Sequence, residues 1–208
     1  MEKSKFQKGW TLVEIGFVLV AVGLLTAAYF AFLDGGGANG SSMSGFLERS
    51  SIAAKKYSSD TGSYPVSGNI AAFSMLGANA NSAAGRANGI AATAATWKGP
   101  YIPDMGGVTD AVASQMDLSK FAEGATLTFQ SAAGGLGRVY WFNVANVDYE
   151  ILKSAYYACM GENAPIPTAA TPAAGVATDI KKCYATPAAF VAGAQGNGVF
   201  AYTVDNRR

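Results

Sequence analysis

The order of hydrophobic and polar residues divides the chain into a short basic start, a long apolar run and a mixed remainder. Residues 1–9, MEKSKFQKG, carry three lysines and one glutamate, and residues 10–33, WTLVEIGFVLVAVGLLTAAYFAFL, follow at once. A helix of this length measures about 36 Å, which is enough to cross a bilayer. Because the lysines precede the run, the positive-inside rule predicts a cytoplasmic N-terminus and an exported remainder.

The segment after the apolar run predicts an interruption and then a second helix. Residues 34–40 read DGGGANG, and each glycine inside a helix costs about 1 kcal/mol, so we expect a break or flexible joint there. Ser41 is a suitable N-cap for a helix that ends near Thr61. One face of that helix is an apolar stripe, which we expect to pack on a sheet: Met43, Phe46, Leu47, Ala53, Ala54 and Tyr57.

The second half of the chain predicts strands and one further helix. Residues 125–131 and 138–147 alternate or are rich in β-formers, and the glycines between them suit a hairpin. Residues 148–160 have helical periodicity with Asp148 as cap, and residues 198–204 form a last strand. The intervening residues 164–178 are a Pro/Ala/Thr-rich loop.

These elements together predict an α+β protein whose N-terminal helix packs on an antiparallel sheet. A short helix is expected at 70–76, and an Ala/Asn/Gly-rich surface loop at 77–95. The globular domain is placed at residues 41–208. Seven aromatic residues at strand and helix spacing could resemble a ligand box, but we assign them to the core: Tyr140, Trp141, Phe142, Tyr156, Tyr157, Phe200 and Tyr202.

Composition narrows the chemistry that this chain can perform. With 15 basic and 14 acidic residues the net charge is +1, which predicts no binding of nucleic acid and no attraction to an anionic membrane surface. The chain has no histidine, which removes the common catalytic triads and most transition-metal sites, so we predict that it is not an enzyme and needs no cofactor. Asp104, Asp110 and Asp117 match no calcium-ligand pattern.

Two cysteines, Cys159 and Cys183, lie far from the N-terminus and 24 positions apart. In an exported chain they would form one disulfide, stabilising the fold by roughly 3–4 kcal/mol in the chain-entropy model. The alternative is two buried, unrelated thiols.

Glu14 does not fit a plain membrane anchor, because it sits inside the apolar run without a basic residue on its own helix face. A carboxylate in hydrocarbon costs several kcal/mol unless it has a partner. Either Glu14 lies near enough to the helix start to reach the headgroups, or its partner is a cation from another molecule.

The string KGWTLVEIGFVLVAVGLL resembles the N-terminus of a type IV prepilin. In that family a prepilin peptidase cuts after the glycine of a short basic leader and methylates the new terminal amine, which implies cleavage between Gly9 and Trp10. The family's glutamate at mature position five corresponds to Glu14 and pairs with the terminal ammonium of a neighbouring subunit. Trp10 in place of the commoner Phe resembles the type IVb branch. An ordinary secretory signal cleaved after Ala28 is the competing interpretation.

Further along, the resemblance is weaker but consistent. Residues 57–65, YSSDTGSYP, and 96–103, TWKGPYIP, resemble pieces of pilins and of major pseudopilins of type II secretion. A helix that carries the first cysteine of a C-terminal pair resembles type IVb pilins, whose disulfide ties such a helix to the chain before the last strand. The family also has one long helix, with an exposed N-terminal half and a C-terminal half packed on the globular domain.

The resemblance implies a structural function. We expect a subunit of an extracellular type IV pilus that polymerises with itself in a helical filament, with the prepilin peptidase and the pilus assembly machinery of the inner membrane as partners. The precursor would reside in the inner membrane and the product at the cell surface. Because the leader contributes a charge of +2 to the total of +1, the remainder carries −1, and subunits would pack mainly through apolar helices.

Two alternatives remain. The first is a pseudopilin of a type II secretion system. The cysteine pair fits a long-lived exposed pilus better, whereas the string Trp-Lys-Gly-Pro-Tyr at residues 97–101 favours the pseudopilin. The second is a membrane-anchored enzyme, against which stand the lack of histidine and of any Gly-x-Ser-x-Gly or Ser-x-x-Lys string.

Overall fold

The computed structural model describes residues 12–65, 68–73, 98–103, 115–134, 137–172 and 181–207. The chain divides into two compact units, Met1–Gly36 and Gly37–Arg208. The boundary falls inside the glycine-rich segment 34–40.

Helix α1 is assigned over Leu12–Thr61, without an interruption at the glycine-rich segment. The predicted break at residues 34–40 is therefore wrong at the level of secondary structure, and Ser41 lies within the helix instead of capping a new one. The predicted end is confirmed, because the helix stops at Thr61 and Gly62 adopts a φ of 85° while its N–H bonds to the Ser58 carbonyl. A positive φ at this position suits glycine, which has no Cβ to clash.

A five-stranded antiparallel sheet has the order β1-β2-β3-β5-β4. Its strands are β1 (Met116–Asp117), β2 (Thr126–Gly134), β3 (Gly137–Asp148), β4 (Cys183–Ala185) and β5 (Asn197–Arg207). The predicted hairpin is confirmed, since β2 and β3 pair from Thr126 opposite Ala145 to Gly134 opposite Gly137. Strands β1 and β4 were not predicted, and β5 is longer than expected.

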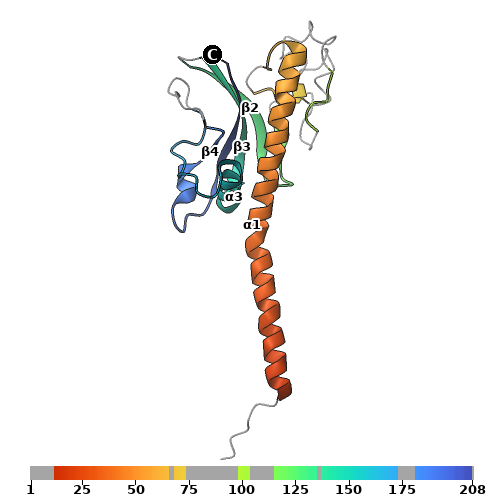
Figure 1. Cartoon of the computed structure of the whole chain (residues 1–208), viewed down its shortest axis with the longest axis vertical. Helices are drawn as coiled ribbons and strands as arrows, with labels where there is room; N and C mark the ends of the chain where they lie inside the picture. Colours follow the sequence, from red (N-terminus) through yellow and green to blue (C-terminus); the bar gives the residue numbers. More distant parts are fainter. Residues whose placement is uncertain are drawn as a thin grey trace, which may run out of the picture. The chain divides into compact units, whose positions relative to one another are not determined.

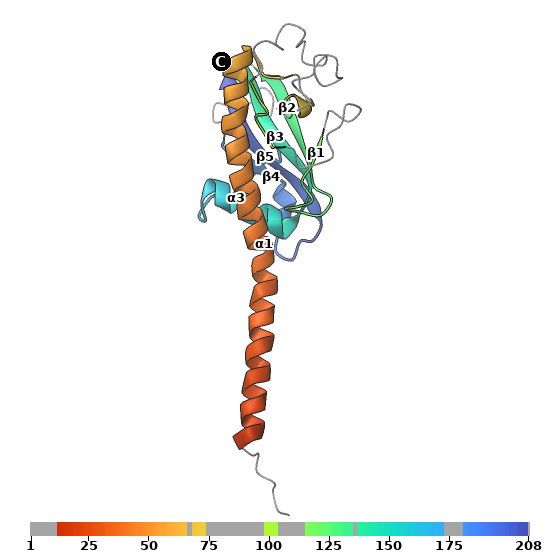
Figure 2. The ribbon, with the colours of Figure 1, turned by 90° about the vertical axis from the view of Figure 1, so that its right-hand side faces the viewer.

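The main core of the Gly37–Arg208 unit lies between one face of this sheet and α1, which runs along it (Figures 1 and 2). The predicted apolar stripe faces this core, with Met43, Leu47 and Ala54 fully buried and Phe46 and Tyr57 nearly so. The sheet contributes alternate residues of β2 and residues from β3 and β5, among them Leu127, Phe129, Phe142, Val144 and Phe200.

The aromatic residues that the sequence assigned to the core lie there to different extents: Phe142, Tyr156, Phe200 and Tyr202 are buried in the main core, and Tyr140 and Tyr157 are only partly buried against it. Phe73 meets Phe129 edge-on with ring centroids 5.1 Å apart, and Phe129 meets Phe142 at 5.5 Å. Trp141 belongs to a second, smaller cluster with Val139, Tyr184 and Ala201. Edge-to-face contacts of this kind stabilise a core beyond the area that they bury.

Helix α3 (Tyr149–Met160) follows β3 directly and is capped as predicted, because the Asp148 carboxylate accepts a hydrogen bond from the Glu150 N–H at 2.9 Å. A short 3₁₀ helix, η4 (Pro187–Phe190), lies between β4 and β5. Of the helix predicted at 70–76, the described part is a single 3₁₀ turn, η1 (Ala71–Phe73), while the loop predicted at 77–95 lies outside the described residues.

Candidate assembly surface and disulfide-bounded region

The structure describes only part of the region in which we predict leader cleavage and pairing between subunits. Gly9 and Trp10 lie outside the described residues. Glu14 is the third residue of α1, and the position of its side chain is also outside the described part of the chain. Cleavage after Gly9 and pairing of Glu14 therefore stay predictions.

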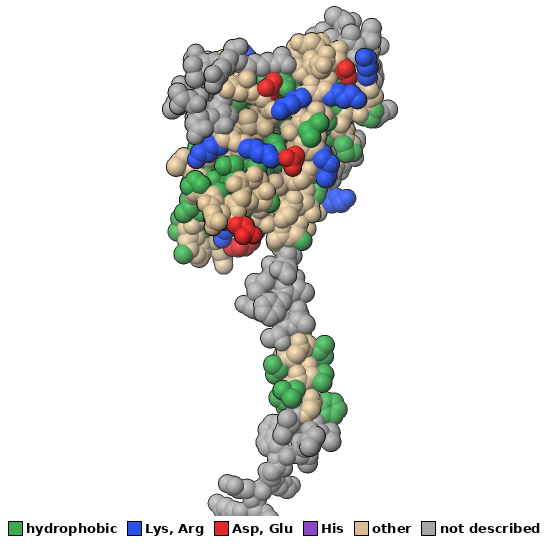
Figure 3. Space-filling model, in the orientation of Figure 1, with side chains coloured by type: hydrophobic (Ala, Val, Ile, Leu, Met, Phe, Trp, Pro, Cys, Tyr) green, Lys and Arg blue, Asp and Glu red, His purple; other side chains and the backbone are tan. Residues whose placement is uncertain are grey.

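The described side chains of the N-terminal unit form an exposed apolar surface. Residues 16–24 are all exposed, and none of them is charged (Figure 3). Phe17 is 73% exposed and Leu19 and Leu24 are each 67% exposed. Soluble monomers rarely leave so many neighbouring large apolar side chains uncovered, so this surface favours contact with an apolar partner. Among the residues that the structure describes, no helix is both long enough and apolar enough to cross a membrane.

Helix α3 contacts the last part of the glycine-rich segment, at Gly37 and Gly40. A Cβ at Gly40 would lie 2.5 Å from the Ile151 carbonyl oxygen and 2.7 Å from the Ala155 nitrogen, so only glycine permits this close approach. The Ser154 hydroxyl also donates a hydrogen bond to the Gly37 carbonyl oxygen at 2.8 Å. This docking offsets the low helix propensity of glycine at Gly37 and Gly40, where the chain is helical.

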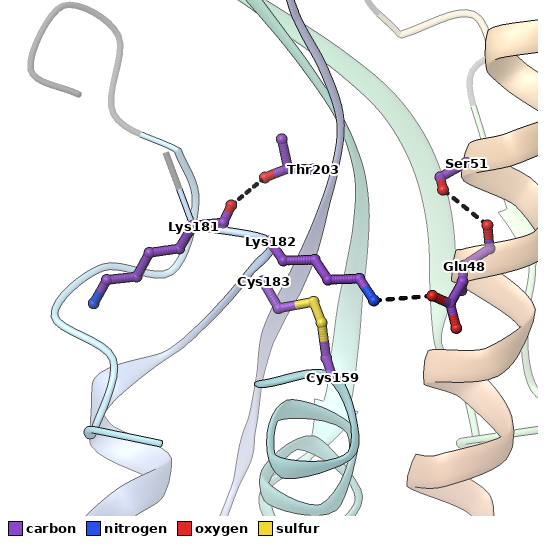
Figure 4. The surroundings of a disulfide bond; sticks show 7 residues. All are labelled: Glu48, Ser51, Cys159, Lys181, Lys182, Cys183 and Thr203. Atoms are coloured by element: carbon purple, nitrogen blue, oxygen red, sulfur yellow. Dashed lines mark hydrogen bonds and ion pairs between the residues drawn. A yellow bond between two sulfur atoms is a disulfide. The ribbon is translucent and has the colours of Figure 1, made fainter. Parts of the chain in front are cut away.

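The predicted disulfide is present. Cys159, in the last turn of α3, is bonded to Cys183, the first residue of β4, with a Cα–Cα distance of 6.4 Å (Figure 4). The bond ties the end of a helix to a strand beside β5, and it closes the loop that includes residues 164–172. Because β4 is only three residues long, the covalent tie compensates for its few backbone hydrogen bonds.

Lys182, next to the disulfide, connects this region to α1. Its Nζ lies 2.9 Å from Glu48 Oε1 (Figure 4). The same Nζ lies 5.5 Å from the centre of the Tyr202 ring. The hydrogen bond from Lys182 lowers the pKa of the Glu48 carboxyl, and the same bond raises the pKa of the Lys182 ammonium. Both side chains are about half exposed, so the pair adds orientation more than stability.

Further hydrogen bonds fix the backbone on both sides of the disulfide. Thr203 donates from its hydroxyl to the Lys181 carbonyl and from its N–H to the Lys182 carbonyl, each at 2.8 Å. The Tyr156 hydroxyl donates to the Pro165 carbonyl at 2.8 Å, and burial raises the pKa of this phenol. The region is thus tied to the sheet and to α3 by more than the covalent bond.

The two segments that resemble pilins and pseudopilins meet at the end of α1. The Tyr101 hydroxyl donates to Asp60 Oδ2 at 2.9 Å and accepts from the Lys98 N–H at the same distance. Tyr57 packs edge-on against Tyr101, with ring centroids 5.2 Å apart. Burial raises the pKa of Tyr57 to about 12, so its phenol stays neutral and acts as a structural group.

The acidic residues considered as calcium ligands do not form a described cluster. Asp104 and Asp110 lie outside the described residues, and Asp117 accepts hydrogen bonds from the backbone and hydroxyl of Ser119. These bonds lower the pKa of the Asp117 carboxyl. Within the described residues, no group of three or more Cys, Asp or Glu side chains is arranged to hold a metal ion.

Comparisons with protein-family models, with curated proteins and with solved structures found no match to this chain. The fold itself is a pilin-like arrangement, in which an N-terminal helix packs on an antiparallel sheet and a disulfide lies near the C-terminus.

Proposed function

We propose that this chain is a structural subunit of an extracellular type IV pilus. It is made as a membrane-anchored precursor, cut between Gly9 and Trp10 by a prepilin peptidase, and polymerised with copies of itself by an assembly machinery in the inner membrane. It has no enzymatic role in this proposal.

The observation that carries the proposal is the character of helix α1. Its described N-terminal side chains are apolar and exposed, whereas its C-terminal part, from Met43 to Tyr57, is buried against the sheet. A monomer gains nothing from the exposed part, but a bilayer or the apolar helices of other copies would cover it. If such a contact joins unlike surfaces of identical subunits and its rotation does not close a ring, it produces a helical filament.

The disulfide favours a pilus over the alternative, a pseudopilin of a type II secretion system. A cross-link between Cys159 and Cys183 suits a subunit that stays outside the cell for long periods. A transient assembly inside the envelope has less need of it.

Glu14 provides the test of the assembly mechanism. In the filament its carboxylate would be neutralised by the Trp10 ammonium of an adjacent subunit, and removing one partner of a buried ion pair costs about 3–5 kcal/mol. Glu14→Val should therefore abolish surface filaments, or reduce their number severely, in electron micrographs of the producing cells. Protein level and disulfide formation should stay normal, because the Gly37–Arg208 unit has a core of its own.

Glu162→Gln is the matched control, because Glu162 is an exposed carboxylate on the surface of the globular unit. This variant should assemble filaments like the wild type. Filaments of normal number and length in the Glu14→Val strain would contradict the pairing mechanism.

A further inference from the structure

A groove on the surface of the globular unit combines positive charge with hydroxyl and aromatic groups. Its volume is about 920 Å³, and it lies between α1 and the two chain segments around Pro103 and Lys120. The α1 side is formed by Ser41, Ser42, Gly45, Phe46 and Arg49, and Phe121 completes the lining on the opposite side. Phe46 and Phe121 are in contact, with ring centroids 5.5 Å apart, and they join the two sides.

The two cations of the groove have no acidic partner among the described residues. Arg49 and Lys120 make none of the salt bridges of the described chain. Glu48, the neighbour of Arg49 in sequence, forms a salt bridge with Lys182. Glu123, three positions after Lys120, takes part in none of the salt bridges between described residues. None of the described residues that line the groove is acidic. The guanidinium of Arg49 extends back along the helix, since one of its Nη atoms lies 3.8 Å from the position of a Cβ at Gly45.

This lining is suited to a phosphate ester. A guanidinium and an ammonium together can neutralise a phosphate oxyanion, and serine hydroxyls can donate to its remaining oxygens or accept from neighbouring hydroxyls. The aromatic pair offers an apolar surface for the methylene groups beside such an ester. The groove is several times larger than a phosphate ion, so a larger molecule that carries one phosphate fits it better.

We propose that this groove binds the headgroup of an anionic phospholipid, such as phosphatidylglycerol, while the chain is anchored in the membrane. The inference rests on the membrane-anchored stage of the proposed function. Ser41 follows the last residue of the apolar run by eight positions, and eight residues span at most about 28 Å even when fully extended. The start of the groove thus stays within that distance of the membrane surface.

The headgroup should be anionic and not zwitterionic. A choline or ethanolamine headgroup brings its own cation, for which the described lining residues provide no carboxylate, whereas a phosphatidylglycerol headgroup brings one negative charge and two hydroxyls. The near-zero net charge of the chain concealed this local feature, because the charges are balanced over the whole sequence and not within the groove.

The test uses the unassembled full chain in micelles of an uncharged maltoside detergent. Dihexanoyl phosphatidylglycerol, dihexanoyl phosphatidylcholine and inorganic phosphate are titrated separately, and the amide chemical shifts of Gly45 and Lys120 are followed by NMR. We expect saturable shifts with the phosphatidylglycerol and none with the phosphatidylcholine over the same range. Arg49→Gln and Lys120→Gln should each raise the dissociation constant at least about tenfold, as the loss of one charged hydrogen bond predicts.

Lys56→Gln is the matched control, because Lys56 is an exposed cation of α1 that does not line the groove. It should change the dissociation constant by less than about twofold. An equal loss of affinity in Lys56→Gln, equal shifts with the phosphatidylcholine, or no saturation would overturn the proposal. If inorganic phosphate binds as tightly as the lipid, the groove is a site for a free anion, and the lipid proposal is wrong.

Shifts at Gly45 that follow protein concentration alone would show that a second copy of the chain occupies the groove, and this also would overturn the lipid proposal. Failure here is distinguishable from failure of the proposed function, since the titration does not involve filaments. Normal filaments together with no lipid binding would contradict only the proposal for the groove. Lipid binding together with no filaments would contradict only the proposal that the chain is a pilus subunit.

Discussion

Ser154 of helix α3 donates a hydrogen bond to the carbonyl oxygen of Gly37 in helix α1 at 2.8 Å. One turn further along α1, the bare backbone of Gly40 lies directly against α3. The glycine-rich segment is therefore a packing surface at this end. Its glycines weaken an isolated helix, but Gly40 allows a second helix to approach.

This packing predicts that Gly40 is sensitive to the smallest substitution. Gly40→Ala places a Cβ 2.5 Å from the Ile151 carbonyl oxygen and must move α3, which should lower the free energy of unfolding by about 1–3 kcal/mol. Gly37→Ala is the control, because a Cβ there has nothing within 4 Å and gains helix propensity. Urea unfolding followed by circular dichroism measures both. A Gly40→Ala variant as stable as Gly37→Ala would contradict the close packing.

The disulfide predicts a redox dependence of stability. Reduction of the wild-type protein removes the link between Cys159 and Cys183 without changing the volume of any side chain, and it should lower the free energy of unfolding by roughly 3–4 kcal/mol. Urea unfolding with and without a reductant gives this difference directly. A change below about 1 kcal/mol would mean that the surrounding hydrogen bonds alone hold the region in place.

The ion pair between Lys182 and Glu48 predicts that the titration of the Glu48 carboxyl changes when Lys182 is replaced. Because the pair lowers the pKa of Glu48 in the folded protein, its contribution is present above the pKa of an unfolded glutamate and is lost as the pH falls through the folded value. In NMR, the side-chain carbonyl of Glu48 should titrate below the ordinary range in the wild type and within it in Lys182→Met. An unchanged Glu48 titration in this variant would show that the pair does not persist in solution.

The raised pKa of Tyr57 predicts that the folded protein loses stability in alkaline solution. Its pKa is about 12 in the folded protein, so the unfolded state, in which tyrosine has its ordinary value near 10, releases the proton first. Stability is therefore retained below pH 10 and should fall as the pH rises from 10 to 12. Tyr57→Phe should reduce this loss, and the part that remains would come from Tyr101 and Tyr156, whose pKa values burial also raises. The same alkaline loss in Tyr57→Phe would assign it to another group.

The sequence predicted the elements whose burial follows a simple period. Leu127 and Phe129 alternate along β2, and Leu152, Ala155 and Tyr156 recur on one face of α3, so their burial could be inferred from spacing. The cap at Asp148 and the end of α1 at Thr61 depend on local chemistry, which the sequence also contains.

What spacing could not predict depends on contacts between distant segments. Glycines 37 and 40 were interpreted as helix breakers because the helix that packs against them lies more than a hundred positions away. Strand β4 has only three residues and exists through its pairing with β5 and the disulfide. The predicted stripe contained only apolar residues, so it left out four serines of α1 that are buried: Ser44, Ser50, Ser51 and Ser58.

In the candidate site, too, the sequence could predict some features and not others. The disulfide could be predicted because two cysteines allow only one pairing, and the structure confirms it. The link from Lys182 to Glu48 and the groove at Arg49 and Lys120 join residues from separate elements, and no local pattern marks them.

The intact mass of the protein in sheared surface fibres tests the central claim most directly. If the chain is a type IV pilin, the mass should correspond to a chain that begins at N-methylated Trp10 and contains one disulfide. A fibre-free cell surface, a chain that retains Met1, or a chain that begins at Tyr29 after cleavage by an ordinary secretory signal would contradict the account.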